Sequence, residues 1–103
     1  MYFPPAETAK PKIDAAIAEV INLMAPHVLN IRYDFGQDWT GEWTIFFRVL
    51  LSDKVAKRKK RSEVAMRVIS EMSDTVIPEL WLIPHFHFRS QSEQAEINDP
   101  AWA

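Results

Sequence analysis

Residues 41–51 read G-E-W-T-I-F-F-R-V-L-L, and this stretch decides the fold. It has the highest density of bulky apolar residues in the chain, and aromatic and β-branched side chains favour a strand. One set of alternate residues is wholly apolar and is predicted to face the core: Trp43, Ile45, Phe47, Val49 and Leu51. Because the opposite set still includes Phe46 and Leu50, we predict a strand that is partly buried on both sides, as a central strand or a strand covered by a partner would be.

The residues before this strand predict a neighbour for it. Between residues 29 and 35 apolar and polar residues alternate, as in a strand with one apolar face. The apolar set is Leu29, Ile31, Tyr33 and Phe35. Residues 36–41, G-Q-D-W-T-G, carry turn-forming residues between the two strands. They lead into a strand and lack a following Lys-Ser/Thr pair, so they predict a hairpin turn and not a phosphate-binding loop.

Two amphipathic helices are predicted to flank the hairpin. The first begins at Pro11, after a loose leader of residues 1–10, and ends at Pro26. Its apolar stripe is Ile13, Ile17, Val20 and Met24. The firm part of the second helix covers residues 62–75 and ends at Pro78, with the basic residues before it as frayed turns or a mobile loop. Its stripe is Val64, Ala65, Val68, Ile69, Met72 and Val76.

A third strand is predicted at residues 82–89, where Phe86 and Phe88 alternate with polar residues. Ser90 and Glu93 then have the spacing of a capping box, which predicts a short helix to about Ile97. The order α-β-β-α-β plus a short C-terminal helix favours an α+β two-layer sandwich, with a three-stranded sheet and two helices on one of its faces. A chain of 103 residues is expected to form a single domain, with an ordered core at residues 10–97 and flexible ends.

The composition narrows the class of protein. The absence of cysteine excludes disulfides and thiolate metal sites. No apolar run approaches the roughly 20 residues that span a bilayer, so we expect a cytoplasmic protein without a membrane partner. The net charge is −2, but residues 54–61, K-V-A-K-R-K-K-R, form a basic run. Five of its residues are candidate nucleic-acid contacts: Lys57, Arg58, Lys59, Lys60 and Arg61. A solvated edge is the simpler interpretation, since no aromatic residue is interleaved.

The sheet face turned away from the helices is predicted to be open, and it gathers the candidate binding residues. Its basic members and Phe46 suit an anion, a nucleic-acid backbone or an acidic protein surface. They are Arg32, Phe46, Arg48, His85, His87 and Arg89. Trp39 at the hairpin tip is a further candidate contact. The alternative is an ordinary solvated face with cross-strand pairs such as Asp34 with Arg48.

The pair His85-x-His87 places two imidazoles on one side of a strand, as a metal site or an acid–base pair requires. No third ligand and no organised pocket follow from the spacing. We therefore assign no catalytic residue, no metal ligand and no cofactor.

Two longer segments are similar to a known family: D-W-T-G-E-W-T-I-F-F-R-V-L-L-S-D at 38–53 and P-H-F-H-F-R-S-Q-S-E-Q-A at 84–95. They resemble the D-W-[ST]-G-[DE]-x-x-I-F-F-R-V and F-x-F-R-S-Q-S-E-Q segments of a family of small uncharacterised bacterial proteins. The resemblance covers residues 28–95. It implies a gene beside one for a HEPN-type protein, and so one half of a two-gene, toxin–antitoxin-like module. The matching positions are Arg48, Arg89, Ser90, Gln91 and Glu93, while His85 and His87 fall where the family varies.

The leading hypothesis is a non-enzymatic protein-interaction module. Its partner is either the product of an adjacent gene or a second copy of the chain. Ser90, Gln91 and Glu93 join the open-face residues as candidate partner contacts. The alternative is a nucleic-acid-binding or nuclease-like protein that uses the arginines and histidines of the open face together with the basic run.

Overall fold

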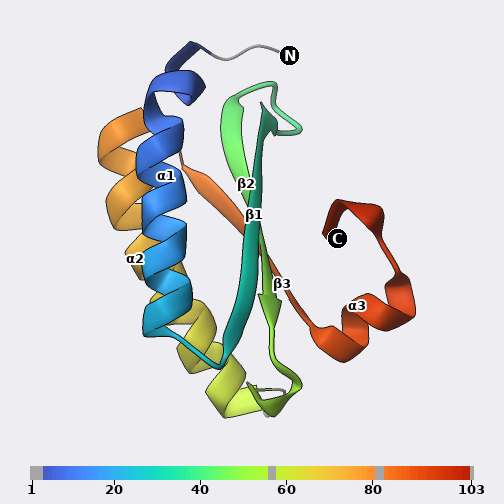
Figure 1. The fold of residues 1–103 in the computed structure, drawn as a ribbon. Coiled ribbons are helices and arrows are strands. Elements are labelled where there is room, and N and C mark those ends of the chain that lie inside the picture. Colours follow the sequence, from blue (N-terminus) through green and yellow to red (C-terminus); the bar gives the residue numbers. More distant parts are fainter. Residues whose placement is uncertain (1–3, 56–57, 81–82, 103) are drawn as a thin grey trace.

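The computed structural model describes residues 4–55, 58–80 and 83–102 (Figure 1). Its elements follow the order α1 (Pro4–Leu23), β1 (Val28–Gln37), β2 (Trp43–Leu51), a 3₁₀ turn η1 (Asp53–Val55), α2 (Arg58–Leu80), β3 (Pro84–Ser90), α3 (Gln91–Ile97) and a 3₁₀ turn η2 (Pro100–Trp102). This order confirms the predicted α+β sandwich with a short C-terminal helix.

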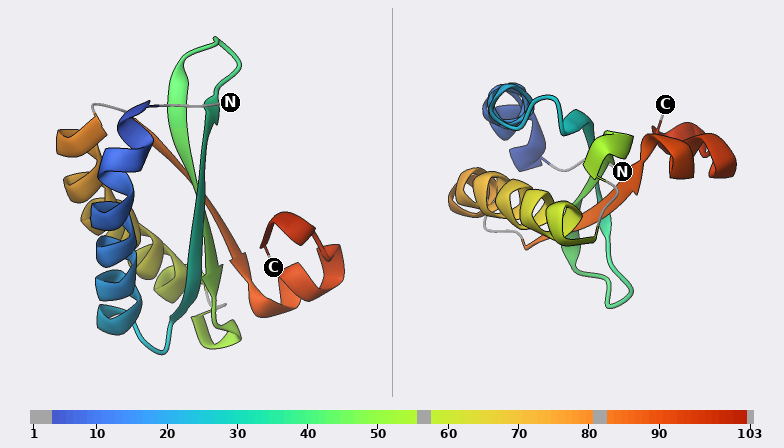
Figure 2. Two further views of the ribbon diagram at one scale, coloured as in Figure 1. Left: turned by 45° about the horizontal axis from the view of Figure 1, so that its top comes forward. Right: turned by 90° about the horizontal axis from the view of Figure 1, so that it is seen from below.

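The three strands form one sheet in the order β1-β2-β3. The hairpin makes β1 and β2 antiparallel, whereas β3 returns through α2 and runs parallel to β2. The long helices α1 and α2 lie together on one face of the sheet, and α3 with the C-terminal residues lies on the other side (Figures 1 and 2). The 41–51 stretch thus supplies the central strand, as predicted.

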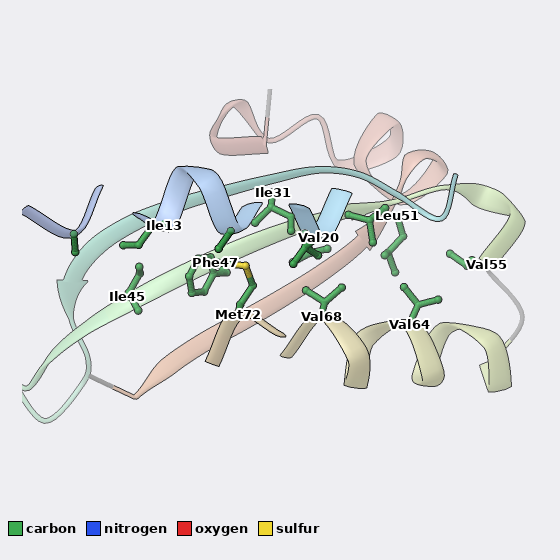
Figure 3. Close-up of a cluster of buried hydrophobic side chains, with 14 residues drawn as sticks. Ile13, Val20, Ile31, Ile45, Phe47, Leu51, Val55, Val64, Val68 and Met72 are labelled. Carbon is green, nitrogen blue, oxygen red and sulfur yellow. The ribbon is translucent and has the colours of Figure 1, made fainter. Parts of the chain in front are cut away.

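The core lies between β2 and the two long helices (Figure 3). Alternate residues of β2 are fully buried there: Ile45, Phe47, Val49 and Leu51. Ile13 and Val20 of α1 and Val68 and Met72 of α2 pack against them. The ring of Phe47 stacks on Phe86 of β3, with centroids 5.0 Å apart. The core face predicted for β2 is therefore confirmed for these four residues.

Both long helices extend beyond their predicted ends. A loose leader was expected up to residue 10, but α1 begins at Pro4 and passes through Pro11. Ala9 is buried and lies four residues before Ile13, so the apolar stripe continues past the proline and holds the first turns in place. The expected stop at Pro78 is also wrong, because α2 continues to Leu80. A proline this close to a helix end removes only one hydrogen bond.

The first strand differs from its prediction at one end. Leu29 was expected to face the core, but it is 39% exposed, whereas Val28 is 2% exposed. The pairing with β2 is irregular between Val28 and Asn30. One extra residue in a strand exchanges the faces before and after it, and a period-two pattern cannot reveal this. The third strand begins at Pro84, while the predicted start at residue 82 lies outside the described residues.

The sheet face opposite the helices was predicted to be open, and that prediction is wrong at the β3 end. The chain leaves α3 at Asn98, whose left-handed backbone (φ 53°) turns it back toward the sheet. As a result, Trp102 packs against the sheet and is only 6% exposed. The tail expected to be flexible therefore packs on the fold, and we keep the name "open face" for the remaining outward surface of the three strands.

Candidate functional site

The strand register arranges the open face in rows that cross all three strands. Arg32 of β1 lies opposite Arg48 of β2, which lies opposite His87 of β3. The next row consists of Asp34, Phe46 and His85. Directly opposed side chains in a sheet lie close enough to interact. The structure therefore places Arg32, Arg48 and His87 in one row, whereas His85 lies in the neighbouring row and Arg89 lies opposite Leu50.

An ion pair fixes the centre of this face. Arg48 Nη1 lies 2.6 Å from Asp34 Oδ2, which confirms the cross-strand pair that the sequence suggested as the ordinary alternative. Arg32 makes no ion pair with any described residue, although it stands directly opposite the positive charge of Arg48. Like charges that oppose each other across strands are destabilising. Arg32 is therefore the residue of this row for which an external carboxylate would be most favourable.

An aromatic contact covers the sheet next to this ion pair. The rings of Phe46 and His85 have centroids 5.4 Å apart. The Phe46 ring also lies over Gly36, where an added Cβ would come within 3.1 Å of Phe46 Cε2. A glycine at this position lets the ring lie flat on the neighbouring strand. Phe46 is thus only partly exposed, and its ring belongs to the floor of the face.

The hairpin tip is a hydrogen-bonded turn that presents Trp39. The carboxylate oxygen Asp38 Oδ1 accepts hydrogen bonds from the Thr40 hydroxyl (2.6 Å), the Thr40 N–H (2.9 Å) and the Glu42 N–H (3.1 Å). These bonds, led by that from the Thr40 hydroxyl, hold the pKa of Asp38 below its ordinary value, and the charge of nearby His85 acts in the same direction. Trp39 is 95% exposed beside this turn.

The C-terminal segment closes the other end of the face. Arg89 Nη1 lies 3.0 Å from Gln94 Oε1 and 3.5 Å from Asp99 Oδ2, and its guanidinium stacks 4.5 Å from the Trp102 ring centroid. Between this segment and the strands is a hollow of about 250 Å³. It is lined by Phe46, Arg48, His87, Arg89, Asp99 and Trp102. No sequence pattern predicted a role for Trp102, because its contact depends on the turn at Asn98.

The residues at the junction of β3 and α3 make hydrogen bonds and an ion pair within the chain. Ser90 and Glu93 form the predicted capping box, in which Glu93 Oε1 accepts from the Ser90 N–H (2.9 Å) and Ser90 Oγ accepts from the Glu93 N–H (3.2 Å). The same Glu93 oxygen lies 2.6 Å from Arg61 Nη1, and Arg61 Nη2 donates to the Phe88 carbonyl at 3.1 Å. Ser90 is buried. These contacts bind β3 to α2 and α3.

Three predicted contact residues bond to one another within the chain, and their predicted roles stay predictions. Ser90 and Glu93 were expected to touch a partner, and Arg61 was expected to touch nucleic acid. Their polar groups are directed at one another instead, because the helix cap and the charge on Arg61 satisfy the same carboxylate. Gln91 is exposed at the start of α3, and its predicted role stays a prediction.

The other predicted nucleic-acid contacts of the basic run lie at or just before the start of α2. Lys59 and Lys60 are exposed in its first turn. Lys57 and the side chain of Arg58 lie outside the described residues.

His85 and His87 are exposed on neighbouring rows of the open face, and the described part of the chain holds no group of three His, Asp or Glu side chains placed to bind a metal. The described helices also include none that is long and apolar enough to cross a membrane.

Comparison of the chain with models of protein families, with curated proteins and with solved structures finds no match.

Proposed function

We propose that this protein is a non-enzymatic protein-interaction module that binds a partner protein with its hairpin tip and the adjoining open face. The observation that carries the proposal is Trp39, which is 95% exposed on a turn fixed by Asp38. Burial of an indole in a partner recovers the free energy that its exposure to water costs, and tryptophan is enriched among residues that dominate binding energy. A fixed turn also reduces the entropy lost on binding.

A second exposed apolar side chain lies at the same end of the sheet as Trp39. Ile83 is 78% exposed, and its carbonyl accepts a hydrogen bond from Thr44 Oγ1 at 2.7 Å. Thr44 lies next to Trp43, the first residue of β2 after the turn. Trp39 and Ile83 are therefore presented from the same end of the sheet, where an interface needs apolar anchors.

The charges of the open face support a partner with an acidic surface. Arg32 has no carboxylate partner among the described residues, and its row continues with Arg48 and His87. We infer a partner surface that is acidic beside an apolar recess able to hold an indole. The resemblance to the small bacterial family suggests the product of an adjacent HEPN-type gene, which would make the pair a toxin–antitoxin-like module.

The test is binding of the tagged full chain to the products of its neighbouring genes, measured by co-purification and then by calorimetry. Trp39→Ala should weaken binding at least about tenfold, because anchor residues carry much of the binding energy. Met66→Ala is the matched control: Met66 is 69% exposed on α2, on the opposite side of the sheet, and its loss should leave binding unchanged. No binding by any neighbour, or equal binding by the Trp39→Ala variant, would show that the proposal is wrong.

Nucleic-acid binding is the second candidate, and the row of Arg32, Arg48 and His87 favours it. Arginines along a sheet can follow a phosphate backbone, and the neighbouring Phe46 could stack on a base. This function predicts binding to labelled RNA or DNA that falls steeply with salt and weakens in the variant Arg32→Glu. Absence of binding at low salt removes it.

A further inference from the structure

We propose that two copies of this chain associate through the outer edges of their β1 strands, antiparallel and in a register centred on Tyr33. The surface concerned is the outer edge of β1, which includes Arg32 and Asp34 at the margin of the open face and leaves out the hairpin tip. Its partner is a second copy of the same chain, and the argument rests on the edge, the groove beside it and the charges along it.

The outer edge of β1 is a free template for strand pairing. The sheet order is β1-β2-β3, so β1 uses one edge for β2, and its other edge pairs with no strand among the described residues. The strand runs from Val28 to Gln37, it contains no proline, and its one irregularity lies near its start, between Val28 and Asn30. Long edges without such interruptions pair readily with another strand.

A groove accompanies this edge on the helix side of the sheet. A hollow of about 490 Å³ lies between α1 and β1, and its lining includes Ile17, Ile31, Tyr33 and Phe35. The Tyr33 hydroxyl donates to Asp14 Oδ1 at 2.9 Å, which fixes the ring in the groove, and Phe35 packs edge-on against it with centroids 5.9 Å apart. Both rings are only partly buried. The apolar residues of a second strand would complete their burial.

The charges along the strand select the register. In antiparallel pairing centred on Tyr33, Arg32 stands opposite Asp34 of the second copy, and Asp34 stands opposite the second copy's Arg32. The same register sets Ile31 opposite Phe35 on the groove side. A shift by one residue would remove both charge pairs, and parallel in-register pairing would oppose like charges. Arg32, which has no ion pair with a described residue of its own chain, would gain a carboxylate.

The resulting dimer has a continuous sheet in the order β3-β2-β1-β1-β2-β3. Because directly opposed residues share a face, the two open faces lie on the same side and join into one surface. The hairpin tips with Trp39 point toward opposite ends of the dimer, so both remain free for other partners.

The test uses paired charge reversals and measures mass by light scattering and sedimentation equilibrium over a range of concentrations. Wild type should reach twice the mass of one chain. Arg32→Asp puts two aspartates opposite two aspartates of the second copy, and Asp34→Arg does the same with arginines. Each single variant should dimerise at least about tenfold more weakly, because two favourable pairs become two repulsive ones. The control Lys59→Asp changes the charge equally at an exposed site on α2 and should dimerise as wild type does.

Mixing distinguishes this edge from any other interface. An equimolar mixture of the Arg32→Asp and Asp34→Arg chains should form a heterodimer, because aspartates on one strand then face arginines on the other. Circular dichroism and thermal unfolding of each variant establish that it is folded. A wild type that stays monomeric at every concentration contradicts the proposal. So does a dimer that is unaffected by the single reversals, or a mixture of folded variants that remains monomeric.

Discussion

The guanidinium carbon of Arg89 lies 4.5 Å from the centroid of the Trp102 ring. A cation above an indole face contributes about 0.5–2 kcal/mol, depending on how far the pair is removed from water. Asp99 adds a carboxylate to the same guanidinium, and Gln94 binds both Arg89 and the Asp99 carbonyl. The chain after α3 is therefore anchored on β3 and forms one wall of the hollow in the open face.

Replacement of Trp102 by alanine should lower the free energy of unfolding by about 2 kcal/mol, because it removes buried ring area and the contact with Arg89. Chemical denaturation measures this change. Hydrogen exchange should also quicken around Asn98, where the chain loses its anchor. Trp39→Ala is the matched control: it removes the same type of side chain from a 95% exposed position and should cost less than about 0.5 kcal/mol. Equal losses in the two variants would mean that Trp102 does not anchor the segment.

Glu93 should make the stability of the protein sensitive to acid. Hydrogen bonds from the Ser90 N–H and then from Arg61 hold the pKa of Glu93 below its ordinary value of 4.5. Because the folded-state pKa is the lower one, this carboxylate stabilises the fold fully above about pH 4.5, and the contribution is lost as the pH falls through the lowered pKa. Asp53, whose pKa the Ser92 N–H lowers, acts in the same direction.

Glu93→Gln should therefore be less stable than wild type at pH 7, by no more than about 1 kcal/mol because solvent screens this 45% exposed carboxylate, and the difference should shrink on acidification. Denaturation at a series of pH values measures it. Glu63→Gln, an exposed substitution of the same kind on α2, should leave the curve of stability against pH unchanged. A difference between Glu93→Gln and wild type that is constant down to pH 3 would contradict this account.

Thr44 is buried on the face of β2 that is turned away from α1 and α2, and its hydroxyl donates to the Ile83 carbonyl at 2.7 Å. Thr44→Val keeps the shape but leaves that carbonyl without its donor, so we predict a loss of about 1–2 kcal/mol in unfolding free energy. Thr44→Ser keeps the hydroxyl and should lose less. If valine and serine cost the same, the methyl group and not the hydrogen bond is what matters at this position.

Gly41 has a φ of 87° and no atom within 4 Å of an added Cβ, so the cost of a side chain there is backbone strain alone. Gly41→Ala should destabilise the fold by about 1 kcal/mol. Gly41→Asn should cost less, since asparagine accepts a positive φ more readily. Thermal unfolding of the two variants provides the comparison, and equal losses would contradict this order.

The helices and strands of this fold could be predicted from the sequence, and each prediction that was wrong has a physical cause. Alternation identified the buried set of β2 because every second residue from Ile45 to Leu51 is apolar. It failed at Leu29, because a register irregularity is set by pairing with β2 and leaves no local signal. It placed the start of α1 at Pro11, because the usual preference of proline for first turns outweighed the apolar spacing of Ala9 with Ile13.

The candidate site was predictable only in part. Strand periodicity placed Arg32, Arg48 and His87 on one face, and the register then set them in one row. The capping box at Ser90 was also visible, but the reach of Arg61 to Glu93 was not, since it joins residues far apart in the sequence. The packing of Trp102 depends on a single left-handed residue, Asn98, and the sequence alone does not reveal that turn.

The central position of β2 has a consequence for the order of folding. Its pairing with β1 closes only a short hairpin, whereas its pairing with β3 must wait until the chain has returned through α2. Closing the longer loop loses more entropy, and parallel pairing brings together residues distant in the chain. The hairpin is therefore expected to be formed in the folding transition state and the Ser90–Glu93 cap only afterwards. Weakening the turn at Gly41 should slow refolding, whereas weakening the cap at Glu93 should chiefly accelerate unfolding.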